Sequence, residues 1–167
     1  MQLIKAPEGI RKVHFTKTWL FLAGSIEMGA AAKWQDEVYE KIKHIPDVTA
    51  FNPRRDDWDS SWKQSIHNKQ FREQVQWEQF YLDRSDVIFF YFAPGTQSPI
   101  TLLEFGQACE LKRDYRRNVE VIVVCPDTFW RKGNVEVMCA NRNIPLYNTL
   151  NDGVQFLIET LEARNAD

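Results

Sequence analysis

The strongest strand signal in the chain is the stretch Asp86-Val87-Ile88-Phe89-Phe90-Tyr91-Phe92, which is followed by Ala93-Pro94-Gly95. An apolar run without polar alternation, closed by proline and glycine, is typical of a strand that is buried on both faces of a sheet. Helices cover both faces of such a sheet in globular proteins. The stretch therefore predicts an α/β protein.

Segments on either side repeat this pattern. Buried strands are predicted at residues 19–23, 48–51 and 119–125, and a proline-containing edge strand at residues 144–147. Helix-period segments alternate with the strands: Trp34, Val38 and Ile42, for example, recur at i, i+4 and i+8. This alternation predicts a doubly wound, five-stranded parallel sheet with the flavodoxin-like strand order 2-1-3-4-5.

Length and composition indicate one globular domain with no polyanionic partner. The chain has 167 residues, of which 44% are hydrophobic, and 21 Lys and Arg against 23 Asp and Glu give a net charge of -2. We expect an extended segment at residues 1–18 and an α/β core at residues 19–164. The near-neutral charge argues against a nucleic-acid polymer as partner. Aromatic residues reach 13%, which suggests that some of them line a binding surface.

The cysteines and the N-terminus predict a cytoplasmic protein. Cys109, Cys125 and Cys139 are odd in number and widely spaced, which favours free thiols in a reducing compartment over a disulfide framework. No signal peptide is recognised, and no apolar run approaches the roughly 20 residues that span a bilayer. We therefore expect no contact with a membrane.

Ligands of open parallel sheets bind beyond the carboxyl ends of the strands. Here this edge corresponds to the loops at residues 23–29, 52–62 and 93–99. The sequence contains no GxGxxG, GxxxxGK[ST] or HExxH motif, and Ser25 lacks the second glycine of a GxSxG elbow. The pattern therefore predicts neither a cofactor nor a metal ion.

Glu104 is the first candidate catalytic residue. It stands early in the helix predicted after the 86–92 strand, between Leu103 and Phe105. A carboxylate near a helix N-terminus, beside a ligand-binding loop, can act as a nucleophile. The alternative is a surface glutamate paired with a basic residue.

Glu78 is the second candidate. Its spacing places it on one helix face with Phe71, Val75 and Leu82. Partial burial there would raise its pKa and suit it to donate a proton, although it could equally be a boundary glutamate. Two carboxyl groups held in different environments beside one cleft are typical of glycosidic-bond chemistry.

The loop after the second predicted strand is rich in polar and aromatic residues. The candidate substrate contacts in it are Asn52, Arg54, Asp57 and Trp58. Trp58 and Trp62 could stack on a planar base, with Trp77 of the following helix nearby, although such a charged run is often only a solvated loop. The Gly24-Ser25 turn could hold a hydroxyl group or an anion through backbone N–H groups.

Taken together, these segments resemble the nucleoside 2-deoxyribosyltransferases, in particular the small nucleoside 2-deoxyribosyltransferase-like branch. The resemblance extends from about Phe21 to Tyr147. It rests on Phe21-Leu22-Ala23-Gly24-Ser25-Ile26-Glu27, Asn52-Pro53-Arg54-Arg55, Gln74-Val75-Gln76-Trp77-Glu78, Asp86-Val87-Ile88, Leu103-Glu104-Phe105-Gly106 and Lys132-Gly133-Asn134-Val135.

The resemblance implies a role for each matching residue. Glu104 would attack the anomeric carbon of a 2'-deoxynucleoside and form a covalent deoxyribosyl-enzyme, and Glu78 would stand where better-known members have an Asp that helps to protonate the base. Ser98 occupies the place of an Asp that touches the sugar hydroxyl, and so is similar to the serines that hold a 5'-phosphate in deoxynucleotide N-glycosidases. Asn134 would reach the pocket of a neighbouring subunit in a homo-oligomer.

Three functions follow as expectations. The first is a transferase that exchanges the base of 2'-deoxynucleosides for a free nucleobase, with net retention and no cofactor. The second is an N-glycosidase that hydrolyses 2'-deoxynucleoside 5'-monophosphates. The third is a non-catalytic nucleotide-sensing module. The sequence leaves open whether the base is a purine or a pyrimidine.

Overall fold

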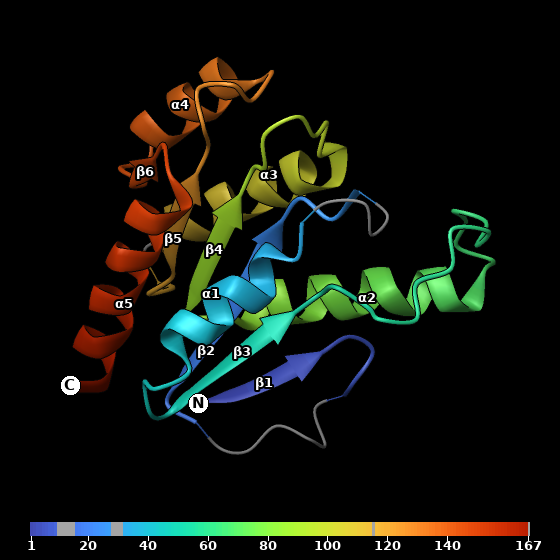
Figure 1. Ribbon diagram of the computed structural model, residues 1–167, viewed down its shortest axis with the longest axis horizontal. Helices are drawn as coiled ribbons and strands as arrows, with labels where there is room; N and C mark the ends of the chain where they lie inside the picture. The colour runs from blue at the N-terminus through green and yellow to red at the C-terminus, as the bar shows by residue number, and fades with distance from the viewer. Residues whose placement is uncertain (10–15, 28–31, 115, 167) are drawn as a thin grey trace.

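The computed structural model describes residues 1–9, 16–27, 32–114 and 116–166. Its strands are β1 (Gln2–Lys5), β2 (Thr18–Gly24), β3 (Val48–Asn52), β4 (Val87–Tyr91), β5 (Glu120–Val124) and β6 (Leu146–Tyr147). They form one sheet in the order β1-β3-β2-β4-β5-β6, in which every neighbouring pair is parallel (Figure 1). The predicted α/β class and the predicted relative order of the five strands are confirmed.

The predicted number of strands is wrong, because the sheet has six. The additional strand is β1, which lies within the segment expected to be extended and pairs with β3 from Gln2 beside Thr49 to Lys5 beside Asn52. Only Ile4 of this strand is fully buried, so β1 lacks the continuous apolar run of an inner strand. Residues 10–15 of the same segment, and residues 28 and 29 of the predicted 23–29 loop, lie outside the described residues.

Helices cover both faces of the sheet (Figure 1). The elements are α1 (Trp34–Ile42), α2 (Lys69–Arg84), α3 (Pro99–Arg113), α4 (Lys132–Ala140) and α5 (Leu150–Ala166). One hydrophobic cluster packs α1 and α5 against the sheet, and a second packs α2, α3 and α4 against the opposite face. Glu78 and Glu104 therefore belong to helices on the same side of the sheet.

One group of aromatic residues builds the core between the sheet and α2. Phe51 stacks on Tyr81 with ring centroids 4.1 Å apart, and Trp77 lies 4.6 Å from Tyr81. Trp77 is only 8% exposed, so the expectation that it belongs to a surface for the base is wrong. Trp58 and Trp62, with centroids 5.2 Å apart, are the pair that remains in the loop before α2.

The buried face of α2 differs from the predicted one. Its buried residues are Gln74, Trp77, Tyr81 and Leu82. The stripe is therefore set by the large rings at positions 77 and 81, whereas Phe71 and Val75 are only partly buried. Glu78 follows Trp77 and lies at the border of this stripe, which leaves it partly exposed.

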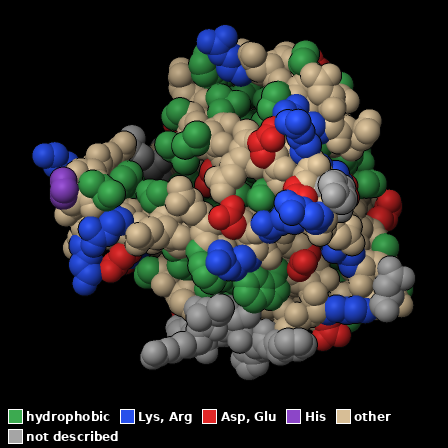
Figure 2. Space-filling model, turned by 180° about the vertical axis from the view of Figure 1, so that it is seen from behind, with side chains coloured by type: hydrophobic (Ala, Val, Ile, Leu, Met, Phe, Trp, Pro, Cys, Tyr) green, Lys and Arg blue, Asp and Glu red, His purple; other side chains and the backbone are tan. Residues whose placement is uncertain are grey.

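The outer surface is mixed in charge. On the side opposite to the view of Figure 1, Lys and Arg side chains are interspersed with Asp and Glu side chains (Figure 2). None of the helices in the described part of the chain combines the length and apolar character needed to cross a bilayer.

Candidate active site

Three loops meet at the carboxyl edge of the sheet, where parallel strands all end. Ser25 follows β2, Asn52 is the last residue of β3, and Ser98 lies between β4 and α3. The helix α3 starts directly after Ser98 and carries Glu104 in its second turn. The residues proposed from the sequence therefore gather at one edge, the usual place of ligand sites in such sheets.

Glu78 and Glu104 lie close enough to repel each other. Burial raises the pKa of Glu104 well above its ordinary value, and the charge of Glu78 raises it further. Burial also raises the pKa of Glu78 to about 7, against a smaller opposing effect of a hydrogen bond from Gln74. Glu104 keeps part of its surface exposed, so a substrate can approach it.

Two carboxyl groups that repel each other in a poorly solvated site titrate as a coupled pair. The first proton is lost at a lower pH than the second, and the apparent pKa values belong to the pair rather than to either residue. Over an intermediate pH range Glu78 and Glu104 therefore share one proton. One ionised and one protonated carboxyl are what general acid catalysis beside a nucleophile requires.

Gln74 fixes the position of Glu78. The Nε2 group of Gln74 donates to Oε1 of Glu78 and to the carbonyl oxygen of Pro53, at 2.8 Å each. The Oδ1 atom of Asn52 accepts the backbone N–H of Arg54 at 2.9 Å. The end of β3 is thereby tied to the helix that carries Glu78.

Three buried polar atoms near this contact between β3 and α2 have no hydrogen-bond partner among the described residues. Nδ2 of Asn52, Oε1 of Gln74 and Nε1 of Trp58 are buried and make no hydrogen bond within the described part of the chain. Buried polar groups in folded proteins nearly always have a partner. The end of β3, the loop after it and α2 therefore together offer two donors and one acceptor to a water molecule or a ligand.

A cluster of three hydroxyl groups joins the other two loops. Oγ of Ser25 lies 2.5 Å from Oγ of Ser98 and 3.0 Å from Oγ1 of Thr96, and it accepts the backbone N–H of Ala93 at 2.9 Å. Gly24 makes this approach possible, because a Cβ atom there would lie 2.4 Å from the carbonyl oxygen of Tyr91. The predicted turn at Gly24 and Ser25 thus packs directly against the loop after β4.

Ser98 does not cap α3 as its position suggests. Its backbone is left-handed, with φ 47°, and its side chain makes no capping hydrogen bond. Its hydroxyl belongs instead to the hydroxyl cluster, defined here as Ser25, Thr96 and Ser98. Pro99 does occupy the start of the helix, where proline needs no N–H donor.

Glu27 completes this cluster and was not singled out as a site residue from the sequence. Its Oε1 atom accepts the backbone N–H groups of Gln97 and Ser98 at 3.0 and 2.7 Å, and lies 3.5 Å from the Ser98 hydroxyl. Glu27 is itself left-handed, with φ 47°. In the sequence, Glu27 stands in the loop after a predicted strand and ends the Phe21–Glu27 segment that carries the family resemblance.

The remaining predicted residues lie around the carboxyl edge. Arg54 is buried and donates to the carbonyl oxygen of Ala32 at 2.9 Å. Asp57 is exposed and makes two 2.8 Å hydrogen bonds with Arg55. Asn134 is exposed on α4. Within the described part of the chain, neither Glu78 nor Glu104 forms a hydrogen bond with any of these three side chains. The described residues also contain no group of three or more His, Cys, Asp or Glu side chains that could hold a metal ion.

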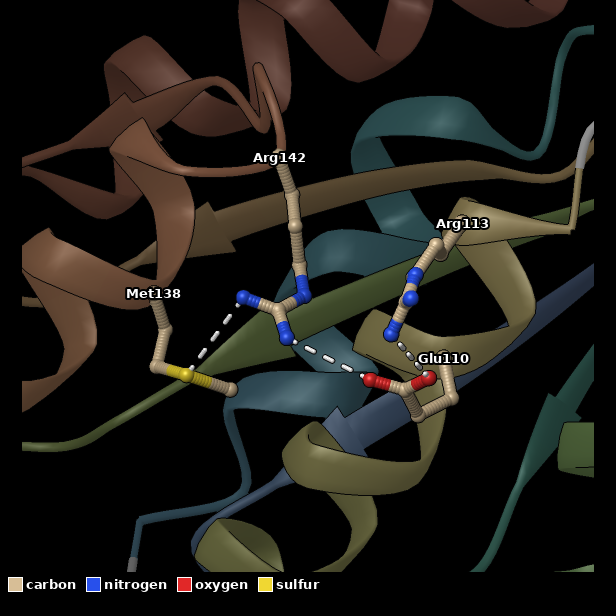
Figure 3. Close-up of polar contacts among 4 residues, drawn as sticks. All are labelled: Glu110, Arg113, Met138 and Arg142. Carbon is tan, nitrogen blue, oxygen red and sulfur yellow. Dashed lines mark hydrogen bonds and ion pairs between the residues drawn. The ribbon is translucent and has the colours of Figure 1, made fainter.

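A separate cavity lies at the far end of α3. It has a volume of about 280 Å³ and is lined by Lys112, Arg113, Asn141 and Arg142. Arg142 contacts Sδ of Met138 at 3.6 Å and Glu110 at 3.3 Å (Figure 3). Because this cavity adjoins the C-terminal ends of α3 and α4, it lies away from the start of α3 and does not include the carboxyl pair.

The raised pKa values predict that the carboxyl pair weakens the fold at high pH. A carboxyl whose pKa is raised in the native state releases its proton more readily when unfolded, so stability falls as the pH rises from about 4.5 towards 7. Glu78→Gln should therefore raise the free energy of unfolding by about 1–3 kcal/mol at pH 8, and by much less at pH 4.5. Thermal unfolding at both pH values measures the difference.

Glu110→Gln is the matched control for this prediction, because Glu110 is exposed at the far end of α3. Its effect on stability should be small at either pH. Equal effects of Glu78→Gln at pH 4.5 and pH 8, or destabilisation at pH 8, would contradict the assignment of a strained carboxyl pair.

A family profile described as "Nucleoside 2-deoxyribosyltransferase like" matches residues 17–129. No curated protein matches the chain significantly. Among solved structures, a conserved protein from Enterococcus faecalis V583 is similar, with 15% sequence identity, a TM-score of 0.48, and coverage of 86% of this chain and 87% of that one.

Proposed function

The chain belongs to the nucleoside 2-deoxyribosyltransferase-like family, and from this premise we propose that it transfers 2'-deoxyribose from one nucleobase to another. The observation that carries the proposal is the repelling pair of Glu78 and Glu104 at the carboxyl edge of the sheet. A transfer of this kind needs a nucleophile for the anomeric carbon and a proton for the departing base. The pair supplies both groups.

The first half of the reaction breaks the N-glycosidic bond. The ionised carboxylate of Glu104 attacks C1' from the face opposite to the base, and a C–O bond forms as the C–N bond breaks. The electron pair of that bond stays on the base nitrogen, which takes the proton of Glu78. The products are a free base, a deoxyribosyl ester of Glu104 and an ionised Glu78.

The second half reverses these steps with a new base. A nitrogen of the incoming base attacks C1', the ester bond to Glu104 breaks, and Glu78 takes up the proton that this nitrogen releases. Two inversions at C1' give net retention. The pair returns to its starting state with one proton, so the cycle consumes no other reactant.

The unpartnered polar groups support a base-binding role for the loop after β3. Nδ2 of Asn52 and Nε1 of Trp58 are donors, and Oε1 of Gln74 is an acceptor, which suits the mixed donors and acceptors on the edge of a nucleobase. Trp62 lies beside Trp58 and adds an apolar face. The side chains of Arg54 and Asp57 shape this loop through their contacts with Ala32 and Arg55.

Exposed apolar residues near the site support the proposal that a second copy of the chain packs there. The large apolar residues exposed on or near α3 and α4 are Ile100, Leu103, Trp130 and Val137, at 51–69% exposure. The indole of Trp130 donates to the carbonyl oxygen of Gln97, so this surface reaches the loop before α3. A second copy packed here would place Asn134 of α4 near the partner's pocket.

The three free cysteines fit a reducing, cytoplasmic setting.

Base exchange is tested directly by incubating the protein with one 2'-deoxynucleoside and a different free base. The expected result is a new 2'-deoxynucleoside, separated by chromatography, formed in equal amount to the base released. Release of base and free sugar without a new nucleoside would replace the transferase by a hydrolase. Binding without release of base would support the non-catalytic alternative.

A further inference from the structure

The carboxylate of Glu27 occupies backbone N–H groups that could otherwise bind an anionic group of a substrate. The two backbone N–H groups before α3, at Gln97 and Ser98, both donate to Oε1 of Glu27. The Ser98 hydroxyl also lies within 3.5 Å of the same atom. Backbone N–H groups at the start of a helix are the usual donors to a phosphate, and the two that immediately precede α3 in this protein are already occupied.

The proposed reaction fixes which part of the substrate lies near Glu27. This step rests on the proposed function, in which Glu104 holds C1' and Glu78 on α2 meets the base. Ser98 precedes Glu104 by six residues, about 9 Å along the axis of α3, and helical side chains lean back towards the N-terminus. With the base on the side towards α2, our proposal places the 5' end of the sugar on the opposite side, towards the start of α3 and the hydroxyl cluster.

We propose that Glu27 makes the enzyme selective for 2'-deoxynucleosides with a free 5'-hydroxyl and rejects their 5'-phosphates. A 5'-hydroxyl can both donate to and accept from the hydroxyl groups of Ser25, Thr96 and Ser98. A 5'-phosphate carries close to two negative charges at neutral pH. It would meet the carboxylate of Glu27 and find the N–H groups of Gln97 and Ser98 already used. Specificity of this kind comes from repulsion of the wrong substrate.

The test compares kcat/KM for one 2'-deoxynucleoside and for its 5'-monophosphate, measured as release of the base. The wild type should prefer the nucleoside. Glu27→Gln removes the charge but keeps an acceptor for the two N–H groups, so it should reduce this preference at least about tenfold. Glu27→Ala also frees the N–H groups and should reduce it further, mainly through a lower KM for the monophosphate.

Two controls keep the test decisive. Glu27→Asp retains the charge and should keep most of the preference, whereas Glu110→Gln at the far end of α3 should not alter the ratio.

Binding of the 5'-monophosphate, measured by calorimetry in a Glu104→Gln background, should tighten at least about tenfold when Glu27→Gln is added. This measurement does not depend on turnover.

The outcomes separate the two proposals. If the wild type releases base from neither substrate, the proposed function fails, while the calorimetric comparison still decides the role of Glu27. If the wild type prefers the monophosphate, or if folded Glu27→Gln and Glu27→Ala proteins leave both the ratio and the affinity unchanged, the role given to Glu27 is wrong.

Discussion

Glu104→Gln is expected to lower the rate of base exchange by at least about 10³-fold, the scale of loss when a catalytic nucleophile is removed. The amide has nearly the shape of the carboxylate but cannot form the ester with C1'. Because the substitution also removes the repulsion from Glu78, the variant should fold and should be no less stable than the wild type at pH 8. Initial rates of exchange and thermal unfolding measure the two effects.

The covalent intermediate gives this prediction a direct readout. Without an acceptor base, the wild type should release a burst of free base equal to the enzyme concentration. Mass spectrometry of the quenched protein should then find one deoxyribosyl group on the peptide that contains Glu104. Glu104→Gln should show neither the burst nor the adduct.

Glu110→Gln serves again as the control, because Glu110 lies on the same helix but at its far end. This variant should exchange bases at the wild-type rate. Wild-type exchange by folded Glu104→Gln, or an adduct on another peptide, would remove Glu104 from the mechanism.

The inner strands could be predicted from the sequence because their physical signal is local. Residues such as Phe89, Phe90 and Val123 are buried between two helical layers, so the segments that contain them must be apolar throughout. The edge strand β1 has only one fully buried residue, Ile4, and its place in the sheet depends on pairing with β3. A four-residue segment contains too little sequence pattern to show that it pairs with a strand that is distant along the chain.

The site was predicted unevenly for the same reason. The helices that carry Glu78 and Glu104 follow from local sequence patterns, but the buried face of α2 does not, because the large rings of Trp77 and Tyr81 set it. Their mutual repulsion depends on how α2 and α3 pack, which no spacing along the chain reveals. The contact of Glu27 with the backbone of Gln97 and Ser98 joins loops about 70 residues apart, and it depends on two left-handed residues that could not be foreseen.

The aromatic residues show how composition can mislead. The high aromatic content suggests that some of these residues line a binding surface, yet Trp77 packs against Phe51 and Tyr81 beside the sheet. A large ring serves equally well in a core and in a ligand site, because both remove apolar surface from water. The position of each ring in the fold decides between these roles, and Trp58 and Trp62 form the aromatic pair in the loop before α2.

Glu78→Gln is expected to slow exchange by about 10²–10⁴-fold, the usual contribution of a general acid and base. The loss should be largest for bases that leave poorly without a proton, and smallest for bases that are good leaving groups. Glu73→Gln, an exposed neighbour on α2, is the matched control and should retain the wild-type rate. Rates with a series of bases of different basicity measure this dependence.

The pH profile distinguishes a proton donor from a residue that only shapes the pocket. In the wild type, activity should rise as the pair loses its first proton and fall as the second is lost. Burial raises the pKa of both carboxyl groups, so the active range should lie above the pH at which an ordinary glutamate titrates. Glu78→Gln should abolish the falling limb. Because Glu78 is protonated and uncharged while Glu104 loses the first proton, the same substitution should leave the rising limb close to its wild-type position. A lower rate with an unchanged profile would show instead that Glu78 holds the substrate without donating the proton.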